Sequence, residues 1–308
     1  MITVQSISKF DKEYATVITI GTFDGVHIGH KRLLERLINN AKTLGLKSTV
    51  LTFFPHPRMI LQKDTDIKLL NTIGERRQIL EKTGLDYLIV HPFTKEFSRL
   101  SATEFVRDIL VNSLRTKKII IGYDHRFGRN RNANIQDLIA FGNTLDFEVE
   151  EISAQEIDDV AVSSTKIRNA LKEGNIKTAN RYLGYEYMLT GIVKKGKGLG
   201  RQLHFPTANL FIAEHYKLIP KNGVYVVKSD RNGATIHGMM NIGYNPTVSG
   251  TKKSIEIHFF DFEEDLYDQK LQVNILQRIR DEHKFDSVEE LKQQLEKDRK
   301  TSLSLLAE

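Results

Sequence analysis

The sequence contains no cysteine, and this absence removes several classes of chemistry. Without cysteine, the chain cannot form a disulfide framework, a thiolate nucleophile or a zinc site with cysteine ligands. It also lacks any apolar run near the roughly 18 residues that cross a bilayer. The first six residues lack the basic start and apolar stretch of a secretory signal. We therefore expect a soluble, cytoplasmic protein that has no membrane partner.

The length and the charge balance set the next limits. The chain has 308 residues, about twice the usual domain size, which favours two domains. Lysine and arginine number 45 against 39 aspartate and glutamate residues, which leaves a net charge of +6. A basic surplus suits nucleic acid or phosphorylated small molecules, and an ordinary solvated surface gives the same surplus. The positions of the basic residues have to decide between these interpretations.

The first half of the chain alternates strand and helix signals. Short β-branched or apolar runs predict strands, and apolar residues at helical spacing between them predict helices. The strands are expected at residues 17–20, 48–54, 87–90, 118–121 and 147–152, and the helices at 33–45, 75–83, 101–114 and 135–145. Strands separated by single helices form parallel β-α-β units. We expect an open, mostly parallel α/β sheet.

After residue 184 the pattern changes to short alternating segments separated by glycines. These segments fall at residues 188–193, 223–228, 236–242, 255–262 and 271–276. Strands without helices between them predict an antiparallel sandwich or barrel. Residues 288–306 are expected to form a terminal amphipathic helix. We therefore expect two domains, 1–184 and 185–308.

The segment His27-Ile28-Gly29-His30 follows the first strand, after a loop over 21–25, at the point where a helix begins. Ligands of parallel α/β sheets bind at the carboxyl ends of the strands, against helix N-termini. Two imidazoles three residues apart face the same side, and Gly29 leaves room for a ligand. This arrangement predicts a site for nucleotide phosphates and departing pyrophosphate. The alternative is two polar residues in an exposed first turn.

A second basic element is Ser163-Ser164-Thr165-Lys166-Ile167-Arg168. Ser164 can cap a helix whose first turn carries Lys166 and Arg168. Capped basic helices are common, so this element indicates a functional site only in combination with the histidine motif.

Two further segments, Thr52 to Arg58 and Gly122 to Gly128, each follow a predicted parallel strand. They therefore lie at the same edge of the sheet as the histidines. Their phenylalanines, with aspartate and arginine, suit an aromatic ring and a phosphate. The structural alternatives are a strand end with two prolines and a basic turn.

The histidine motif together with the later Ser-Ser-Thr-x-Ile-Arg is similar to the nucleotidyltransferase superfamily that includes class I tRNA synthetases. With the other two segments in their order, the chain resembles the prokaryotic bifunctional riboflavin kinase/FMN adenylyltransferase, or FAD synthetase, family. The sequence departs from the family pattern at His125 and at residues 129–134. These departures affect the expected shape of the flavin pocket and not the expected reaction. The resemblance implies a Rossmann-like nucleotidyltransferase domain that transfers AMP from ATP to FMN, giving FAD and pyrophosphate.

The resemblance also carries roles over to single residues. His27 and His30 become catalytic. The residues for ATP and its phosphates are Gly21, Phe23, Asp24, Gly29, Ser164, Thr165 and Arg168. The residues for the flavin are Phe54, Pro55, Arg58, Asp124, Arg126 and Phe127. The phosphate of FMN is already an anionic nucleophile, so this step needs positioning, charge neutralisation and Mg²⁺ rather than a general base.

Three segments of the second half carry chemistry of their own. Residues 196–201 form a glycine-rich basic loop, which either cradles phosphates or simply connects two strands. Thr207 and Asn209 lie two apart, hence on one face of a strand, where both can coordinate Mg²⁺; an ordinary strand edge is the alternative. In Ile255 to Phe259, alternation puts Glu256 opposite the apolar residues, where it is either solvent-exposed or functional.

These segments resemble the riboflavin kinase module in identity and order, as do 245–247 and the Arg-x-Glu-x-x-Phe pattern at 280–285. His204 and Asp268-Gln269 depart from the family pattern. The resemblance implies an antiparallel β-barrel with a C-terminal helix that phosphorylates riboflavin to FMN with ATP. Glu256 is carried over as the base, and Thr207 and Asn209 as the residues that place Mg²⁺. The remaining ATP- and phosphate-binding residues are Gly196, Gly198, Gly200 and Arg201.

Two other interpretations stay open. The first is a nucleotidyltransferase for another small acceptor, whose second domain would only bind or regulate. The Pro-Thr-Ala-Asn segment and Glu256 argue against this interpretation. An RNA-binding protein would fit the basic charge, but the sequence has no stacking-aromatic RNA signature. We expect ATP, riboflavin, FMN and FAD as partners and no nucleic acid, and an oligomer is possible.

Overall fold

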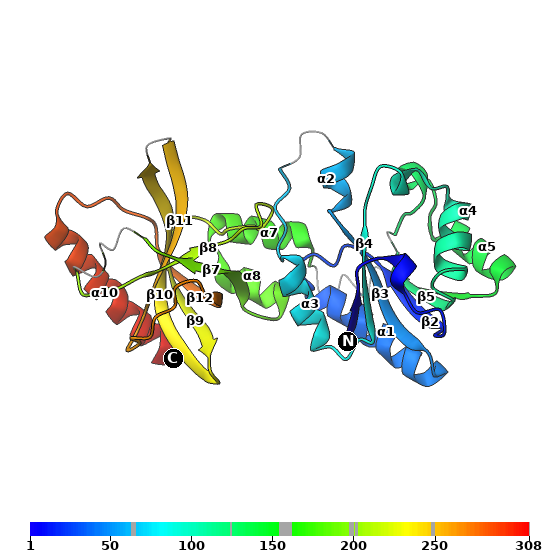
Figure 1. Ribbon diagram of the computed structural model, residues 1–308, viewed down its shortest axis with the longest axis horizontal. Helices are drawn as coiled ribbons and strands as arrows, with labels where there is room; N and C mark the ends of the chain where they lie inside the picture. The colour runs from blue at the N-terminus through cyan, green and yellow to red at the C-terminus, as the bar shows by residue number, and fades with distance from the viewer. Residues whose placement is uncertain are drawn as a thin grey trace. The chain divides into compact units, whose positions relative to one another are not determined.

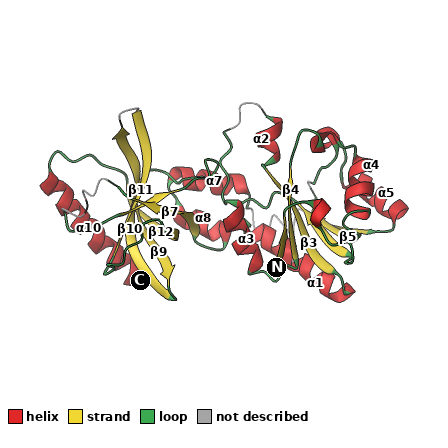
Figure 2. Cartoon of the chain, in the orientation of Figure 1, coloured by secondary structure: helices red, strands yellow, loops and turns green. Residues whose placement is uncertain are grey.

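The computed structural model describes residues 1–62, 66–123, 125–153, 162–196, 200, 203–247 and 250–307, without the side chains of 245–247 and 250–252. The chain divides by its contacts into two compact units, Met1–Ser164 and Thr165–Glu308. Helices flank strands in the first unit, and strands dominate the second (Figure 2). The predicted division of the two activities after residue 184 stays a prediction.

The first unit is built on a six-stranded sheet whose neighbouring strands are all parallel (Figure 1). Its order is β1-β4-β3-β2-β5-β6. The strands are β1 (Ile2–Val4), β2 (Thr16–Ile20), β3 (Lys47–Phe54), β4 (Tyr87–Pro92), β5 (Thr116–Gly122) and β6 (Glu148–Ile152). Every residue of the central β2 is buried, as a β-branched run covered on both faces requires. The predicted parallel α/β sheet is confirmed.

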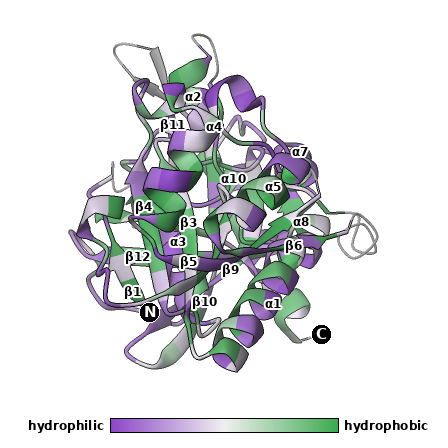
Figure 3. Cartoon of the chain, turned by 90° about the vertical axis from the view of Figure 1, so that its right-hand side faces the viewer, coloured by the Kyte–Doolittle hydropathy of each residue, from purple (hydrophilic) through white to green (hydrophobic). Residues whose placement is uncertain are grey.

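Helices cover this sheet between its strands. They are α1 (Ile28–Leu44), α2 (Pro57–Leu61), α3 (Ile73–Glu81), α4 (Ala102–Glu104) and α5 (Ile135–Leu145), with short turns of 3₁₀ helix at η1 (Ile7–Lys9), η2 (Phe97–Arg99) and η4 (Arg129–Arg131). Leu34, Leu37 and Ala41 form the buried stripe of α1, and hydrophilic residues alternate with hydrophobic ones along this helix in Figure 3. Gly45 ends α1 with a φ of 64°.

The helix predicted over 101–114 has a different form. The Ser101–Glu104 capping box is present, but α4 ends at Glu104 and a π-helix, η3 (Phe105–Val111), follows. Backbone N–H groups there reach back five residues, from Asn112 to Arg107 and from Leu114 to Ile109. The wider turn buries Phe105, Val106 and Leu110 in the core of the first unit. Periodicity in the sequence does not separate this geometry from an α-helix.

The second unit is a closed barrel of antiparallel strands in the order β10-β11-β8-β7-β12-β9. The strands are β7 (Tyr187–Lys194), β8 (Ala208–Phe211), β9 (Gly223–Arg231), β10 (Ala234–Thr247), β11 (Gly250–Phe259) and β12 (Lys270–Arg280). This confirms the barrel. The strand expected around Thr207 and Asn209 is β8, which begins only at Ala208, and β11 ends at Phe259 rather than at residue 262. The helix expected to start at Ser164 is α7 (Ser164–Glu173). Helix α8 (Ile176–Leu183) was not predicted, and its Asn180 donates to the Ile275 carbonyl oxygen of β12 at 2.9 Å.

The C-terminal helix α10 (Val288–Ala307) is fastened to the barrel by a buried ion pair. Arg280 reaches the Asp298 carboxylate with Nε at 2.9 Å and Nη2 at 2.6 Å, and Asp298 is 1% exposed. Leu291 and Leu295 of the same helix pack against a cluster that holds Phe205 and Phe260. The predicted terminal helix is therefore an integral part of the second unit. In the part of the chain described, no helix combines the length and the apolar character needed to cross a membrane.

Candidate nucleotide and flavin sites

The strand order of the first unit marks a place for a ligand. β2 leads through α1 to β3 on one side, whereas β5 lies on the other side of β2. The chain order of the sheet therefore reverses at β2, and ligands of open α/β sheets bind at the carboxyl ends of strands at such a point. The histidine motif follows β2 and the segment 122–128 follows β5, so both of these segments leave the sheet at this point.

His27 and His30 form a stacked pair at the start of α1. Their ring centroids are 3.7 Å apart, with 23° between the ring planes. The Nδ1 atom of His27 accepts a hydrogen bond from the His30 backbone N–H at 3.4 Å, so His27 is the N-cap of the helix. A Cβ atom at Gly29 would lie 3.3 Å from the His27 ring, which explains the glycine between the histidines.

Burial governs the charge of this pair. It lowers the pKa of His30 well below 6.5, and the nearby His27 and Arg76 lower it further. The Nδ1 atom of His30 is buried and has no hydrogen-bond partner among the described residues. The neutral form of the His30 imidazole is therefore favoured, and its Nδ1 is a polar atom that a ligand could engage.

Phe23 supports the histidine pair from the loop after β2. Its ring is 2% exposed and lies 4.9 Å from the His30 ring, centroid to centroid. A Cβ atom at Gly21 would lie 3.1 Å from the Phe23 ring, which leaves little space for a larger residue. The structure thus brings Gly21, Phe23 and Gly29 together around the two histidines.

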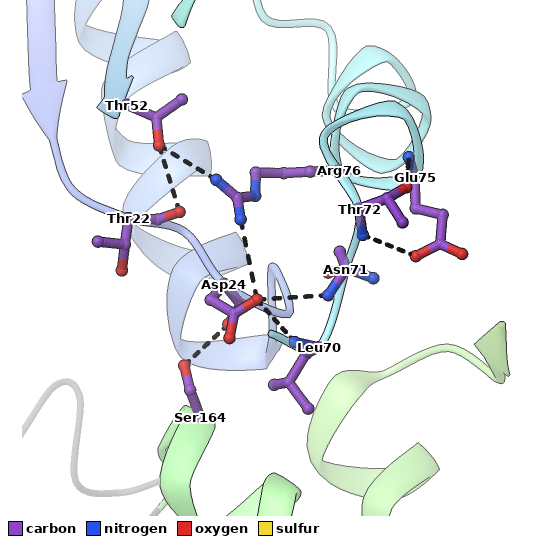
Figure 4. A network of polar contacts seen from close by, with 9 residues as sticks. All are labelled: Thr22, Asp24, Thr52, Leu70, Asn71, Thr72, Glu75, Arg76 and Ser164. Carbon is purple, nitrogen blue, oxygen red and sulfur yellow. Dashed lines mark hydrogen bonds and ion pairs between the residues drawn. The ribbon is translucent and has the colours of Figure 1, made fainter. Parts of the chain in front are cut away.

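Asp24 is buried, and its carboxylate organises the surrounding backbone (Figure 4). Oδ1 accepts hydrogen bonds from the backbone N–H groups of Leu70 at 2.9 Å and Asn71 at 3.3 Å, and lies 3.8 Å from Nη2 of Arg76. These contacts place Asp24 against the segment that leads into α3. In the structure the carboxylate holds this loop, and the phosphate-binding role that the resemblance implies for Asp24 stays a prediction.

Two other residues complete this network. Arg76, which is 2% exposed, donates from Nη1 to Oγ1 of Thr52 at 3.3 Å. The Ser164 hydroxyl donates to the Asp24 carbonyl oxygen at 2.8 Å. The sequence analysis did not select Arg76, because its burial depends on Asp24, 52 residues earlier in the chain. Thr165 and Arg168 lie on α7 in the second unit, and their assignment to the phosphate site stays a prediction.

The residues predicted for the flavin follow β3 and β5. Phe54 and Pro55 are half-buried and joined by a cis peptide bond, and Arg58 lies exposed on α2. Phe127 is buried, Arg126 is exposed, and Asp124 lies outside the described residues. Next to Phe54, the Phe53 ring of β3 lies 5.6 Å from Phe93 and 5.4 Å from Phe97, two aromatic residues that the sequence analysis did not select.

The barrel carries a row of polar residues across three strands. Glu256 of β11 lies directly opposite Asn209 of β8 and opposite Asn241 of β10. Directly opposed residues of antiparallel strands project from the same face. All three are half-buried, whereas Ile255 and Ile257 are buried on the other face. The predicted alternation of β11 is confirmed, and Asn241 joins a row that sequence analysis could not assemble.

Two glycines of the basic loop lie against the Thr207–Asn209 segment. A Cβ atom at Gly196 would lie 2.2 Å from Nδ2 of Asn209, and one at Gly200 would lie 2.3 Å from the Phe205 carbonyl oxygen. Only glycine permits this approach without a shift. Gly196 therefore lies against Asn209 of the polar row and Gly200 against the segment that leads into β8, while Gly198 and Arg201 lie outside the described residues.

A second carboxylate lies beyond the row. Glu282 accepts hydrogen bonds from the Tyr244 backbone N–H at 3.2 Å and from Nδ2 of Asn222 at 3.1 Å. It also sits above Gly243, where a Cβ atom would come within 2.0 Å of its Oε1. The Arg-x-Glu-x-x-Phe pattern thus contributes Glu282 near the end of the row and Arg280 to the α10 ion pair.

A cavity of about 310 Å³ opens beside Thr207. Its lining is apolar at Val193, Ile257 and Phe259 and acidic at Glu263, Glu264 and Asp265. In the described part of the chain, no group of three or more histidine or acidic side chains could hold a metal ion by itself. Any metal at Thr207 and Asn209 must therefore bring most of its ligands with it.

Comparison with known proteins bears on both units. The family model for FAD synthetase matches residues 9–166, and the model for riboflavin kinase matches 183–306. The chain belongs to the bifunctional riboflavin kinase/FMN adenylyltransferase family. The protein of that name from Listeria monocytogenes is 38% identical over 293 residues, 94% of this chain and 92% of that protein. The one from Escherichia coli K12 is 34% identical over 300 residues, 97% of this chain and 95% of that protein.

A solved structure has the same two-unit fold. It is described as a macrolide-efflux protein from Streptococcus pneumoniae and matches with a TM-score of 0.87 at 31% identity, over 98% of each chain. This description differs from those of the bifunctional family, whose two models match this chain in sequence order.

The Asp24–Arg76 pair yields a first testable prediction. Asp24→Asn should lower the free energy of unfolding of the first unit by about 3 kcal/mol, because it leaves the buried Arg76 charge beside a neutral amide. Arg76→Met should cost a similar amount, because it leaves the carboxylate buried without its cation. Hydrogen exchange of the β2 amides reports this free energy for the first unit.

A matched double variant provides the control. Asp24→Asn with Arg76→Met should cost at least about 1 kcal/mol less than the two single changes added together, since the double variant loses the Asp24–Arg76 interaction only once. Strict additivity would show that the two groups do not interact.

Proposed function

We propose that the His27–His30 pair carries adenylyl transfer and that Glu256 carries phosphorylation in this riboflavin kinase and FMN adenylyltransferase. The protein converts riboflavin to FMN and FMN to FAD. The observation that supports the kinase assignment is the register of Glu256 with Asn209. The observation that supports the transferase assignment is the stacked histidine pair beside the strand-order reversal.

Adenylyl transfer requires positioning rather than proton abstraction. An oxygen of the FMN phosphate attacks the α-phosphorus of ATP, the bond to the bridging oxygen breaks, and pyrophosphate leaves. The developing charge falls on the pyrophosphate oxygens, where N–H donors stabilise it. His30 supplies such a donor from a neutral ring, and the polyphosphate favours its protonated form once bound. His27 holds the helix start and stacks on His30.

Phosphorylation starts from a neutral primary alcohol on the ribityl chain. Glu256 accepts the hydroxyl proton as the oxygen forms its bond to the γ-phosphorus, and ADP leaves. The carboxylate can do this because β11 places it on the polar face of the barrel, away from the buried residues Ile255 and Ile257. A substitution that preserves its volume should therefore leave the core intact.

The donor set beside Glu256 fits Mg²⁺. The Thr207 hydroxyl and the Asn209 amide offer the hard oxygen ligands that this ion prefers, and Mg²⁺ usually binds with one or two protein groups plus phosphates. When bound, the ion neutralises charge on the phosphates. Gly196 and Gly200 lie against the same segment, where their backbone can approach the phosphates.

The cavity beside Thr207 has the chemistry expected for the rest of the nucleotide. Apolar side chains such as Val193 and Phe259 can cover the faces of the base. The carboxylates at Glu263, Glu264 and Asp265 can accept hydrogen bonds from the amino group and the ribose hydroxyls. We assign this cavity to the base and ribose of the ATP that is consumed by the kinase.

His30 gives the test of the transferase site. His30→Ala should slow FAD formation from FMN by about 10²-fold or more, because one positioned transition-state donor is lost. FMN formation from riboflavin should continue, since Glu256 lies in the other unit. Chromatographic separation of the flavins measures both steps, and a variant that forms FAD at the normal rate would contradict the assignment. His27→Ala, expected to act in the same direction, also removes the helix cap.

Glu256 gives the test of the kinase site. Glu256→Gln keeps the volume of the side chain but cannot accept the proton, so riboflavin phosphorylation should fall by roughly 10²–10⁴-fold. FAD synthesis from supplied FMN should stay near the wild-type rate. If the carboxylate only stabilised the barrel, the variant would instead melt earlier and lose activity only as it unfolds. Normal kinase turnover in folded Glu256→Gln would leave the base unassigned.

Metal removal tests the third assignment. EDTA should abolish both activities, because each uses ATP phosphates whose charge must be neutralised. The melting temperature without nucleotide should not change, since the described residues contain no cluster that could hold a metal alone. A large drop in melting temperature on chelation would instead indicate a structural metal.

A further inference from the structure

His258 takes no part in the reaction as described, yet it lies beside the proposed kinase site. It follows Glu256 by two residues on β11 and therefore projects from the same face. Its Nδ1 lies 2.9 Å from the Pro206 carbonyl oxygen. Because a carbonyl oxygen only accepts hydrogen bonds, Nδ1 must carry the hydrogen. The imidazole is therefore a donor to the residue that immediately precedes Thr207.

The ring is held firmly in this place. Phe205 packs against it at 5.1 Å between centroids, and Phe260 packs against it at 5.9 Å, both edge to face. Phe205 and Phe260 are themselves buried in the cluster that includes Leu291 and Leu295 of α10. The donor is thus fixed by the barrel and by its C-terminal helix.

The segment that receives this hydrogen bond lies just outside the sheet. β8 begins at Ala208, so Thr207 precedes its first ladder position. On the other side, the Phe205 N–H donates to the Gly200 carbonyl oxygen at 2.8 Å. Proline has no N–H to donate, so position 206 can be fixed by backbone hydrogen bonding only through its carbonyl oxygen. His258 supplies the hydrogen bond to that carbonyl.

The charges around the ring leave its role as a donor intact. Burial lowers the pKa of His258, the bond to Pro206 opposes this shift, and Arg299 of α10 and Asp261 act in opposite directions. Arg299 and Asp261 pair with each other at 3.4 Å. Among the described side chains of β11, Glu256 is the ionisable group that shares this face with His258. In either charge state of the ring, Nδ1 keeps its hydrogen and can donate.

We propose that His258 is a positioning residue of the riboflavin kinase reaction. Its Nδ1–H holds the Pro206 carbonyl and so places the Thr207 hydroxyl and the Asn209 amide where Mg²⁺ and ATP need them. This inference rests on the proposed roles of Thr207, Asn209 and Glu256. Small displacements of such ligands carry a large cost, since a shift of about 1 Å can reduce a rate by 10²-fold.

Two substitutions separate the hydrogen bond from the packing of the ring. His258→Phe keeps an aromatic ring between Phe205 and Phe260 but removes the donor. His258→Asn places an amide N–H close to the position of Nδ1 but removes the ring. In the full-length chain, His258→Phe should lower kcat/KM for riboflavin phosphorylation by about 10- to 100-fold, chiefly through a higher KM for MgATP. His258→Asn should recover most of this loss.

The first unit provides an internal control. FAD formation from supplied FMN should match wild type in both variants, and their melting curves should show that the chain is folded. If His258→Phe melts early, His258→Leu takes its place, and the same loss of kinase activity is expected. The KM for riboflavin should stay near the wild-type value, because the displaced groups face the nucleotide.

Two outcomes would overturn the proposal. Normal kinase kinetics in the folded His258→Phe or His258→Leu variant would show that the hydrogen bond is dispensable. A loss in His258→Asn as large as that in His258→Phe would show that a donor at this position does not restore the reaction, so the hydrogen bond would not be what His258 contributes. Glu256→Gln, measured in parallel, separates this test from the proposed function. If Glu256→Gln retains kinase activity, the catalytic assignment fails; if it is inactive while His258→Phe is normal, only the positioning role fails.

Discussion

The buried carboxylate of Asp24 is the constraint on which the first unit depends. It lies in the turn after the central strand, and it binds two backbone N–H groups and a buried arginine from the segment that leads into α3. Because Arg76 also donates to Thr52 on β3, one network ties together the ends of two neighbouring strands and a helix start. The positive φ values of Phe23 and Val26, 46° and 34°, show how sharply this turn is bent. Such a turn, once fixed, sets the position of the histidine pair.

In the second unit, glycine contacts and a histidine hydrogen bond, rather than a buried charge, hold the residues at the end of a strand. Asn209 and Glu256 are placed by strand register, which is rigid, but Thr207 lies just before the ladder begins. Before the first ladder position, the segment is held by contacts from Gly196 and Gly200 and by the hydrogen bond from His258. In both units the groups proposed to meet phosphate lie at the end of a strand, and a neighbouring segment far along the chain holds them there.

Much of this architecture was predictable because it depends on local patterns. Buried β-branched runs gave the strands of the sheet, and alternation gave the polar face of β11 with Glu256 on it. Local patterns could not reveal that Glu256 faces Asn209, 47 residues away, since β8 has only four residues. Arg76 likewise looks like an ordinary helical arginine until Asp24 is placed beside it. The π-helix at Phe105–Val111 was not predicted for another reason: its apolar spacing also fits an α-helix.

The two sites differ as the two nucleophiles differ. FMN brings an ionised phosphate, so the proposed transferase site needs N–H donors rather than a base, and burial favours the neutral form of the His30 ring. A carboxylate placed there would repel both substrates. Riboflavin brings a neutral alcohol, so the proposed kinase site needs a proton acceptor, and Glu256 lies at the centre of a row whose other members are amides. The amides can ligate a cation or bind a hydroxyl without competing for the proton. Only riboflavin must lose a proton, and this difference accounts for the central carboxylate in the proposed kinase site and for the imidazoles in the proposed transferase site.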